Sequence, residues 1–151
     1  MNRRKFIGIG AGVVATALVL PSQLSAVDFR KKDAKAFADK DIKSALKDLY
    51  GTDATIKGGV SISAPDIAEN GAVVPITVST DKANVKSIAV FIEGNPEALA
   101  AVFNVPATSI PKYALRVKMR KTGHIVVVAN VDGKLYTNKK LVKVTIGGCG
   151  G

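Results

Sequence analysis

The chain has 151 residues, with 22 Lys and Arg against 12 Asp and Glu, and therefore a formal net charge of +10. One His and one Cys are too few for the groups of ligands that metal sites use, so we expect no metal and no other cofactor. Basic charge raises nucleic acid as a partner, but the lysines are scattered and no row of stacking aromatics accompanies them. An acidic protein or a small anion is the better match for this charge.

The N-terminal segment has the three-part layout of an export signal. Residues 1–5 are basic, residues 6–20 are apolar or small, Pro21 ends that run, and Ser25 and Ala26 offer a small-residue cleavage point. A helix of residues 6–20 would span roughly 22 Å, which is short of the ~30 Å hydrocarbon core of a bilayer. We therefore expect residues 1–26 to be a removable signal and the mature protein to be periplasmic. Removal deletes three basic and no acidic residues, which lowers the net charge to +7.

The basic start also suggests an export route. Arg3, Arg4 and Phe6 resemble the twin-arginine motif, in which two arginines precede an aromatic and an aliphatic residue. The match is partial, because Asn2 replaces the usual Ser or Thr and Gly8 stands where Lys is common. The twin-arginine route and ordinary secretion therefore both stay open, and both lead out of the cytoplasm.

After the signal, residues 27–38 are highly charged and are expected to form a linker, followed by one domain over residues 39–146. The domain begins with a helix of about three turns that Asp39 or Asp41 can cap and that Gly51 ends. Its apolar residues recur at the spacing of one helical face, and they are Ile42, Ala45, Leu46 and Leu49.

Beyond the helix the apolar period changes to two, which predicts strands. The expected strands lie in residues 60–64, 74–79, 87–92, 99–105, 113–120, 124–131, 134–136 and 141–146. Pro75 indicates an edge strand or a bulge, the nearly all-apolar run 124–131 indicates a central strand, and Asp132 with Gly133 indicates a hairpin turn. Short strands separated by turns predict a mainly β fold, an antiparallel β-sandwich preceded by one helix.

Few residues in this domain suggest chemistry. His124 could in principle act as a base for Cys149, but a nucleophile on a flexible tail lacks the fixed geometry of catalysis, and we expect His124 to be a turn or edge residue. Arg116, Lys118 and Arg120 lie on one side of an expected strand. They form either an ordinary solvated face or a stripe that attracts anions or a partner.

Cys149, the only cysteine, is the strongest candidate. It lies in the tail 147–151, between Gly147 and Gly148 on one side and Gly150 and Gly151 on the other. A structural disulfide would need a second cysteine, and a buried thiol should lie within a patterned strand. An unpaired cysteine in an exported protein indicates an intermolecular bond or a reactive thiol. We expect Cys149 to carry a covalently attached group.

The flanking glycines leave the backbone free and add no side chains beside the thiol. Fully extended, five residues reach roughly 17 Å. No cationic residue lies beside Cys149 to activate it, and the terminal carboxylate two residues further on opposes ionisation of the thiol. Such a thiol suits a flexible arm that enters the active sites of other proteins, which supply the activation.

The C-terminal sequence VTIGGCGG, residues 144–151, resembles the end of the SoxY family, the sulfur carriers of the bacterial thiosulfate-oxidising (Sox) system. Residues 41–46, residues 64–75 and the pair Asn95 and Pro96 resemble that family too, so the similarity runs through most of the mature chain. The GGCGG end is the most specific part of the resemblance.

The resemblance implies an immunoglobulin-like β-sandwich that forms a heterodimer with a SoxZ-like subunit, which lacks its own signal and is exported together with it. It implies that Cys149 is the covalent attachment site and that Gly147, Gly148, Gly150 and Gly151 form the flexible arm. A haem-containing c-type cytochrome, SoxXA, would join thiosulfate oxidatively to the thiol. The SoxB hydrolase would then release sulfate, and in some organisms a sulfane dehydrogenase, SoxCD, would oxidise the remaining sulfur. The chain itself would be a carrier and not an enzyme.

Two other interpretations stay open. A sulfur carrier of the ubiquitin-like kind works through a terminal Gly-Gly carboxylate, which Gly150 and Gly151 match, but it needs activation by ATP in the cytoplasm and the export signal argues against it. The second is an exported β-sandwich binding module that is disulfide-linked to a partner through Cys149.

Overall fold

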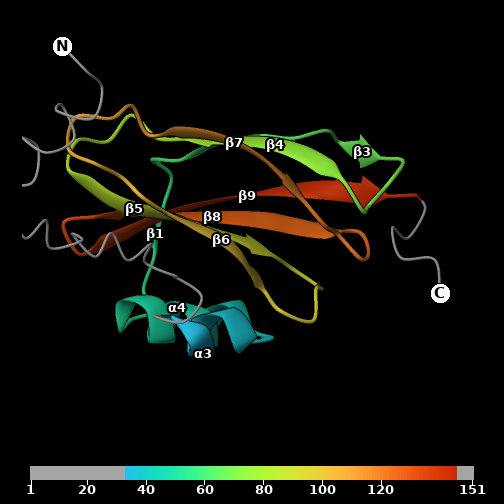
Figure 1. The fold of residues 1–151 in the computed structure, drawn as a ribbon, viewed down its shortest axis with the longest axis horizontal. Helices are drawn as coiled ribbons and strands as arrows, with labels where there is room; N and C mark the ends of the chain where they lie inside the picture. The colour runs from blue at the N-terminus through green and yellow to red at the C-terminus, as the bar shows by residue number, and fades with distance from the viewer. Residues whose placement is uncertain (1–32, 146–151) are drawn as a thin grey trace, which may run out of the picture.

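The computed structural model describes residues 33–145, which form a mainly β domain with two helices (Figure 1). The expected signal, residues 1–26, and the expected arm, residues 147–151, lie outside the described residues. No helix within residues 33–145 combines the length and the apolar character needed to cross a membrane. In chain order the elements are α3 (Ala34–Ala38), α4 (Ile42–Tyr50), β1 (Ile56–Lys57), β2 (Ser61–Ser63), β3 (Ile67–Ala68), β4 (Val74–Ser79), β5 (Val85–Ile92), β6 (Leu99–Asn104), β7 (Lys112–Val117), β8 (Gly123–Val131) and β9 (Lys134–Val144).

The strands form two sheets. The larger has the order β1-β9-β8-β5-β6, with β3 also paired to β9, and the smaller has the order β2-β4-β7. The long ladders are antiparallel as expected, whereas the two-residue strands β1 and β3 pair with β9 in parallel. The two strands expected at 134–136 and 141–146 are one strand, because β8 pairs with β9 without a break from Val131 opposite Lys134 to Gly123 opposite Val142.

One hydrophobic cluster fills the space between the two sheets, and a second lies between the larger sheet and the helices. Strands β5 and β8 supply both clusters, because successive side chains of a strand point to opposite faces. Ile88, Val90, Ile125 and Val127 belong to the first cluster. Ala89, Phe91 and Val128 belong to the second, together with Ala45 and Leu46 of α4. The expectation that residues 124–131 form a central strand is confirmed.

Helix α4 has the caps that the sequence predicts. The Asp41 side chain accepts a hydrogen bond from the Ser44 backbone N–H at 3.2 Å, which satisfies one of the free N–H groups of the first turn. Gly51 ends the helix in the left-handed conformation, with φ of 76°. Helix α3 is not expected from the sequence. It lies within the segment expected to be a linker and buries Ala36 against the second cluster.

Pro75 does not lie in an edge strand, because β4 is the middle strand of the smaller sheet. However, β2 pairs with β4 only opposite Thr77–Ser79, whereas β7 pairs with β4 along its whole length. Pro75 therefore has a strand on one side only, which is where a residue without an N–H group is tolerated in a sheet.

Replacing the N-cap of α4 should destabilise the whole domain, because α4 covers the outer face of the larger sheet. We expect Asp41→Ala to lower the free energy of unfolding by about 1 kcal/mol, measured by urea denaturation. Asp41→Asn keeps a capping oxygen and should stay within a few tenths of a kcal/mol of the wild type. An equal loss in both variants would show that the charge of Asp41, and not its cap, stabilises the helix.

Candidate functional site

The described part of the candidate site is the base of the expected arm. Cys149, the expected attachment site, and its four flanking glycines lie outside the described residues, as do Arg3, Arg4 and Phe6 of the export motif. The structure describes the chain up to Thr145, immediately after β9. We call residues 143–145 the arm base.

Strand β3 holds one side of the arm base. Ile67 pairs with Lys143 and Ala68 with Val144 in parallel register. The Lys143 backbone N–H donates to the Asp66 carbonyl at 2.9 Å, and the Thr145 N–H donates to the Ala68 carbonyl at 3.1 Å. Figure 1 shows β3 lying beside the arrowhead of β9 at one end of the molecule. The last described residue is therefore still bonded to the domain.

Thr122 holds the other side. The pairing of β8 with β9 ends at Gly123 opposite Val142, and the Thr122 side chain continues it. The Val144 backbone N–H donates to Thr122 Oγ1 at 2.9 Å, and this hydroxyl lies 3.5 Å from the Val144 carbonyl, to which it donates. Together with the bonds to the Asp66 and Ala68 carbonyls, three consecutive backbone N–H groups of the arm base have partners, which fixes the direction of the chain at Thr145.

The expected basic stripe lies in the β7–β8 region, and its members share one side of the chain. Arg116, Lys118 and Arg120 are exposed, whereas Val117 and Met119 between them are buried. Only Arg116 belongs to β7; Lys118 and Arg120 follow the end of that strand.

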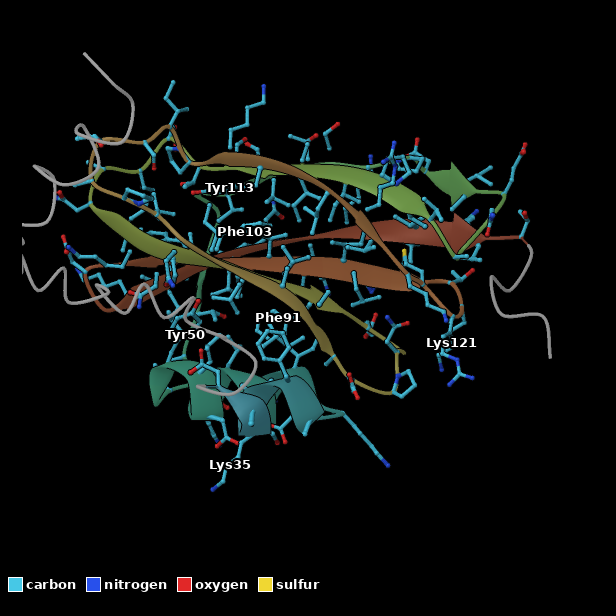
Figure 2. The ribbon with its side chains drawn as sticks, in the orientation of Figure 1. Lys35, Tyr50, Phe91, Phe103, Tyr113 and Lys121 are labelled. Carbon is cyan, nitrogen blue, oxygen red and sulfur yellow. The ribbon has the colours of Figure 1, made fainter. Side chains whose placement is uncertain are left out.

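The Asn95 side chain holds the segment after β7 in place. It donates to the Lys118 carbonyl at 2.7 Å and accepts from the Arg120 N–H at 3.0 Å. Lys121, which follows, lies at the same end of the molecule as β3 (Figure 2). Lys121 and the exposed Lys143 of the arm base therefore lie at one end of the domain. The exposed Asp66 carboxylate before β3 lies there too, and it is ion-paired with Lys140 at 3.1 Å.

His124 is the second residue of β8, an interior strand between β9 and β5, and not an edge residue as expected. Its Nδ1 lies 2.6 Å from Glu93 Oε2, and its backbone N–H donates to the same oxygen at 3.1 Å. Both hydrogen bonds lower the pKa of Glu93, and the bond to the His124 side chain has the larger effect. Gly123 beside it must lack a side chain, because a Cβ there would lie 2.6 Å from the Glu93 carbonyl oxygen.

The described residues offer little else for catalysis. Within residues 33–145 no group of three or more His, Cys, Asp and Glu side chains is placed to hold a metal ion. Sequence reasoning missed Thr122 and β3. The first is a polar residue in a turn and the second has only two residues, so neither produces a periodic signal.

The domain defined by this geometry is a mainly β protein of two sheets, with helices on the outer face of the larger sheet and a firmly held last strand. Residues 46–149 match the family model of the sulfur oxidation protein SoxY. The solved structure of the sulfur carrier protein SoxY from Chlorobium limicola f thiosulfatophilum is 39% identical, with a TM-score of 0.63. The match covers 68% of this chain and 94% of that one. The chain belongs to the SoxY family, the sulfur carriers of the Sox system.

A more distant likeness concerns the fold alone. The superoxide reductase (neelaredoxin) from Ignicoccus hospitalis is 18% identical, with a TM-score of 0.51, over 58% of this chain and 80% of that one. Among curated proteins no match was found.

The hydroxyl of Thr122 should be needed to hold the arm base, because it pairs with both backbone groups of Val144. We expect Thr122→Val to speed amide hydrogen exchange at Val144 at least tenfold, while exchange within β5 stays unchanged. The measurement is residue-resolved exchange by NMR. Thr122→Ser keeps the hydroxyl and should behave like the wild type. Equal exchange in the Val and Ser variants would show that the hydroxyl does not hold the arm base.

Proposed function

We propose that this chain is a periplasmic sulfur carrier that binds thiosulfate-derived sulfur covalently on Cys149 and presents it to partner enzymes. The observation that supports this most is the SoxY family match, which extends to residue 149 and so includes the only cysteine. Export of the precursor, by the twin-arginine route that Arg3, Arg4 and Phe6 indicate or by ordinary secretion, is part of the proposal.

The arm base supports a division between a fixed domain and a thiol carried on a separate arm. The chain is bonded to the domain up to Thr145, and Cys149 follows four residues later. Four extended residues reach at most about 14 Å, so the thiol can move within a volume of that radius around a fixed point. A fixed point of departure reduces the disorder that must be lost when the arm enters a partner's channel.

The proposed loading step is an oxidation. Thiosulfate and the Cys149 thiol form a new S–S bond to give Cys149–S–S–SO₃⁻, with release of one proton and two electrons. The electrons need an acceptor, and we assign that role to a haem-containing c-type cytochrome of the SoxXA kind. The exposed side chains of Arg120, Lys121 and Lys143 near the arm base would favour the approach of the thiosulfate dianion and stabilise the anionic adduct.

The proposed unloading step is a hydrolysis. Water attacks the terminal sulfone sulfur, which gives Cys149–S–SH and hydrogen sulfate, and the step consumes no electrons. We assign it to a SoxB-like hydrolase and, where the host has one, the oxidation of the remaining sulfur to a SoxCD-like dehydrogenase. In this scheme the chain provides no catalytic group of its own. We further propose that the domain is immunoglobulin-like and forms a heterodimer with a SoxZ-like subunit.

Replacing the thiol tests the carrier function directly. Cys149→Ser should unfold at the same denaturant concentration as the wild type and should abolish thiosulfate-dependent electron transfer in a reconstituted system. Intact mass spectrometry of the wild type from its host should show thiosulfonate or sulfane adducts on Cys149. A stable protein disulfide there would favour the exported binding module instead, and a terminal thiocarboxylate would favour a ubiquitin-like carrier.

The glycines of the arm should matter for access and not for reactivity. Gly148→Ala or Gly150→Ala adds a methyl group beside the thiol and restricts the backbone, so each should slow delivery to partner enzymes. Gly150→Val should slow delivery more. Alkylation of Cys149 by a small free reagent, measured in parallel, should keep its rate. A parallel drop in both rates would mean that the glycines tune the thiol itself, and no drop in either would refute the arm.

A further inference from the structure

One edge of the larger sheet is open and uncharged. Among the described residues β6 pairs with β5 alone, so one side of its backbone has no strand beside it. The sequence from residue 98 to residue 111, which contains β6 and the loop after it, has no charged residue, although 23% of the whole chain is charged. Exposed edges are usually protected by charge, Pro or shortness, because an open edge attracts other strands.

The other edge strands of the two sheets have such protection. Strands β1 and β2 are only two and three residues long. Strand β7 follows Pro111 and contains Lys112 and Arg116. Strand β6 has six residues without charge or Pro. Its composition is therefore that of a strand covered by a partner.

The hydrogen-bonding direction of β6 shows which groups are open. The Val105 backbone N–H donates to the Lys86 carbonyl at 3.0 Å, toward the β5 side. Ser87 pairs with Asn104, and Ala89 pairs with Val102. Because inward and outward groups alternate along an antiparallel strand, the N–H and C=O groups of Val102 and Asn104 point away from β5. They are the groups to which an added strand would bond.

The loop that follows β6 adds an apolar contact. Ile110 is 84% exposed, the highest value among the large hydrophobic residues described. Its position is held, because Ser109 N–H donates to the Pro106 carbonyl at 3.0 Å and Lys112 N–H donates to the Ile110 carbonyl at 2.8 Å. A large apolar side chain fixed in solvent is typical of an interaction surface.

The edges of the two sheets lie side by side here. The rings of Phe103 from β6 and Tyr113 from β7 are stacked, with centroids 4.4 Å apart (Figure 2). The loop with Ile110 connects the same two strands, so β6 and Ile110 belong to one side of the domain. We call β6 together with Ile110 the open edge.

We propose that the open edge is the surface by which this chain binds its partner subunit, which adds an extended strand alongside β6 and covers Ile110. This inference rests on the heterodimer proposed above and states which surface of the chain the second subunit binds. Main-chain bonds to Val102 and Asn104 would supply affinity, as in other cases of strand addition.

The occupant is a different protein of neutral or acidic charge, and not a second copy of this chain. Without residues 1–26, the expected signal, the chain has a formal net charge of +7. The uncharged open edge cannot offset the repulsion between two such copies, whereas an acidic partner would be attracted by it.

The test uses the complex purified from the native host, the second subunit separated from it, and variants of this chain. Asn104→Pro removes an outward N–H but no bond to β5, and Asn104 is exposed, so the fold should tolerate it. We expect Asn104→Pro and Ile110→Lys each to weaken binding at least tenfold by calorimetry. Asn104→Ala keeps the N–H, and Ile56→Lys changes an exposed apolar residue of β1. Both of these control variants should bind like the wild type.

Amide exchange gives a second readout that needs no variant. In the complex, the amides of Val102 and Asn104 should become protected, whereas those of Ala101 and Phe103, which face β5, should be protected with or without the partner. Unchanged affinity in both test variants and unprotected outward amides would overturn the open edge but leave the partnership intact.

Two other outcomes count against the proposal in different ways. If no second subunit is recovered, both the partnership and this site are wrong, while the adducts on Cys149 still decide the carrier function. If the wild type forms a homodimer that Asn104→Pro abolishes, the open edge is used, but the assignment to a different protein is wrong.

Discussion

Strands β5 and β8 are covered by apolar side chains on both faces, and the rest of the domain is arranged around this double burial. Residues such as Val90 and Val127 pack against the smaller sheet, while Phe91 and Val128 pack against the helices. A strand pair that is apolar on both faces must be covered on both, which is why α3 and α4 lie against the larger sheet. Because β9 pairs with β8 from Lys134 to Val142, this core also fixes the strand that leads to the tail.

The proposed carrier function combines a rigid base with a glycine-rich end. Backbone N–H groups of residues 143–145 donate hydrogen bonds to Thr122, Asp66 and Ala68 and hold the chain up to Thr145. The glycine residues around Cys149, in contrast, place no side chain beside the thiol. Each part serves a different need. The rigid base limits the volume that the thiol explores, and the glycines allow the thiol into narrow channels. Within this scheme reactivity comes from the partner enzymes, in keeping with a tail that has no cation beside the thiol.

Sequence reasoning predicted the elements that have a strong local signal. The caps Asp41 and Gly51 delimit α4, and the apolar run 124–131 gives the central strand β8. It missed α3, β1 and β3, because two to five residues are too few to show a period. It divided β9, whose polar middle is held extended by pairing with β8 and not by its own pattern. The family could be inferred from the GGCGG tail, whereas the role of Thr122 depends on a contact 22 residues away along the chain.

The sheet order separates the two surfaces on which the proposals depend. From β6 to β9 there are three strand spacings, through β5 and β8, or about 14 Å at ~4.8 Å each. A strand added outside β6 would therefore lie on the edge away from β9, and β3, Thr122 and the arm base would remain uncovered. A partner bound at the open edge and an enzyme that receives the arm need not compete for one surface. The partner could stay bound throughout a cycle while enzymes take turns at Cys149, as a carrier that serves several reactions requires.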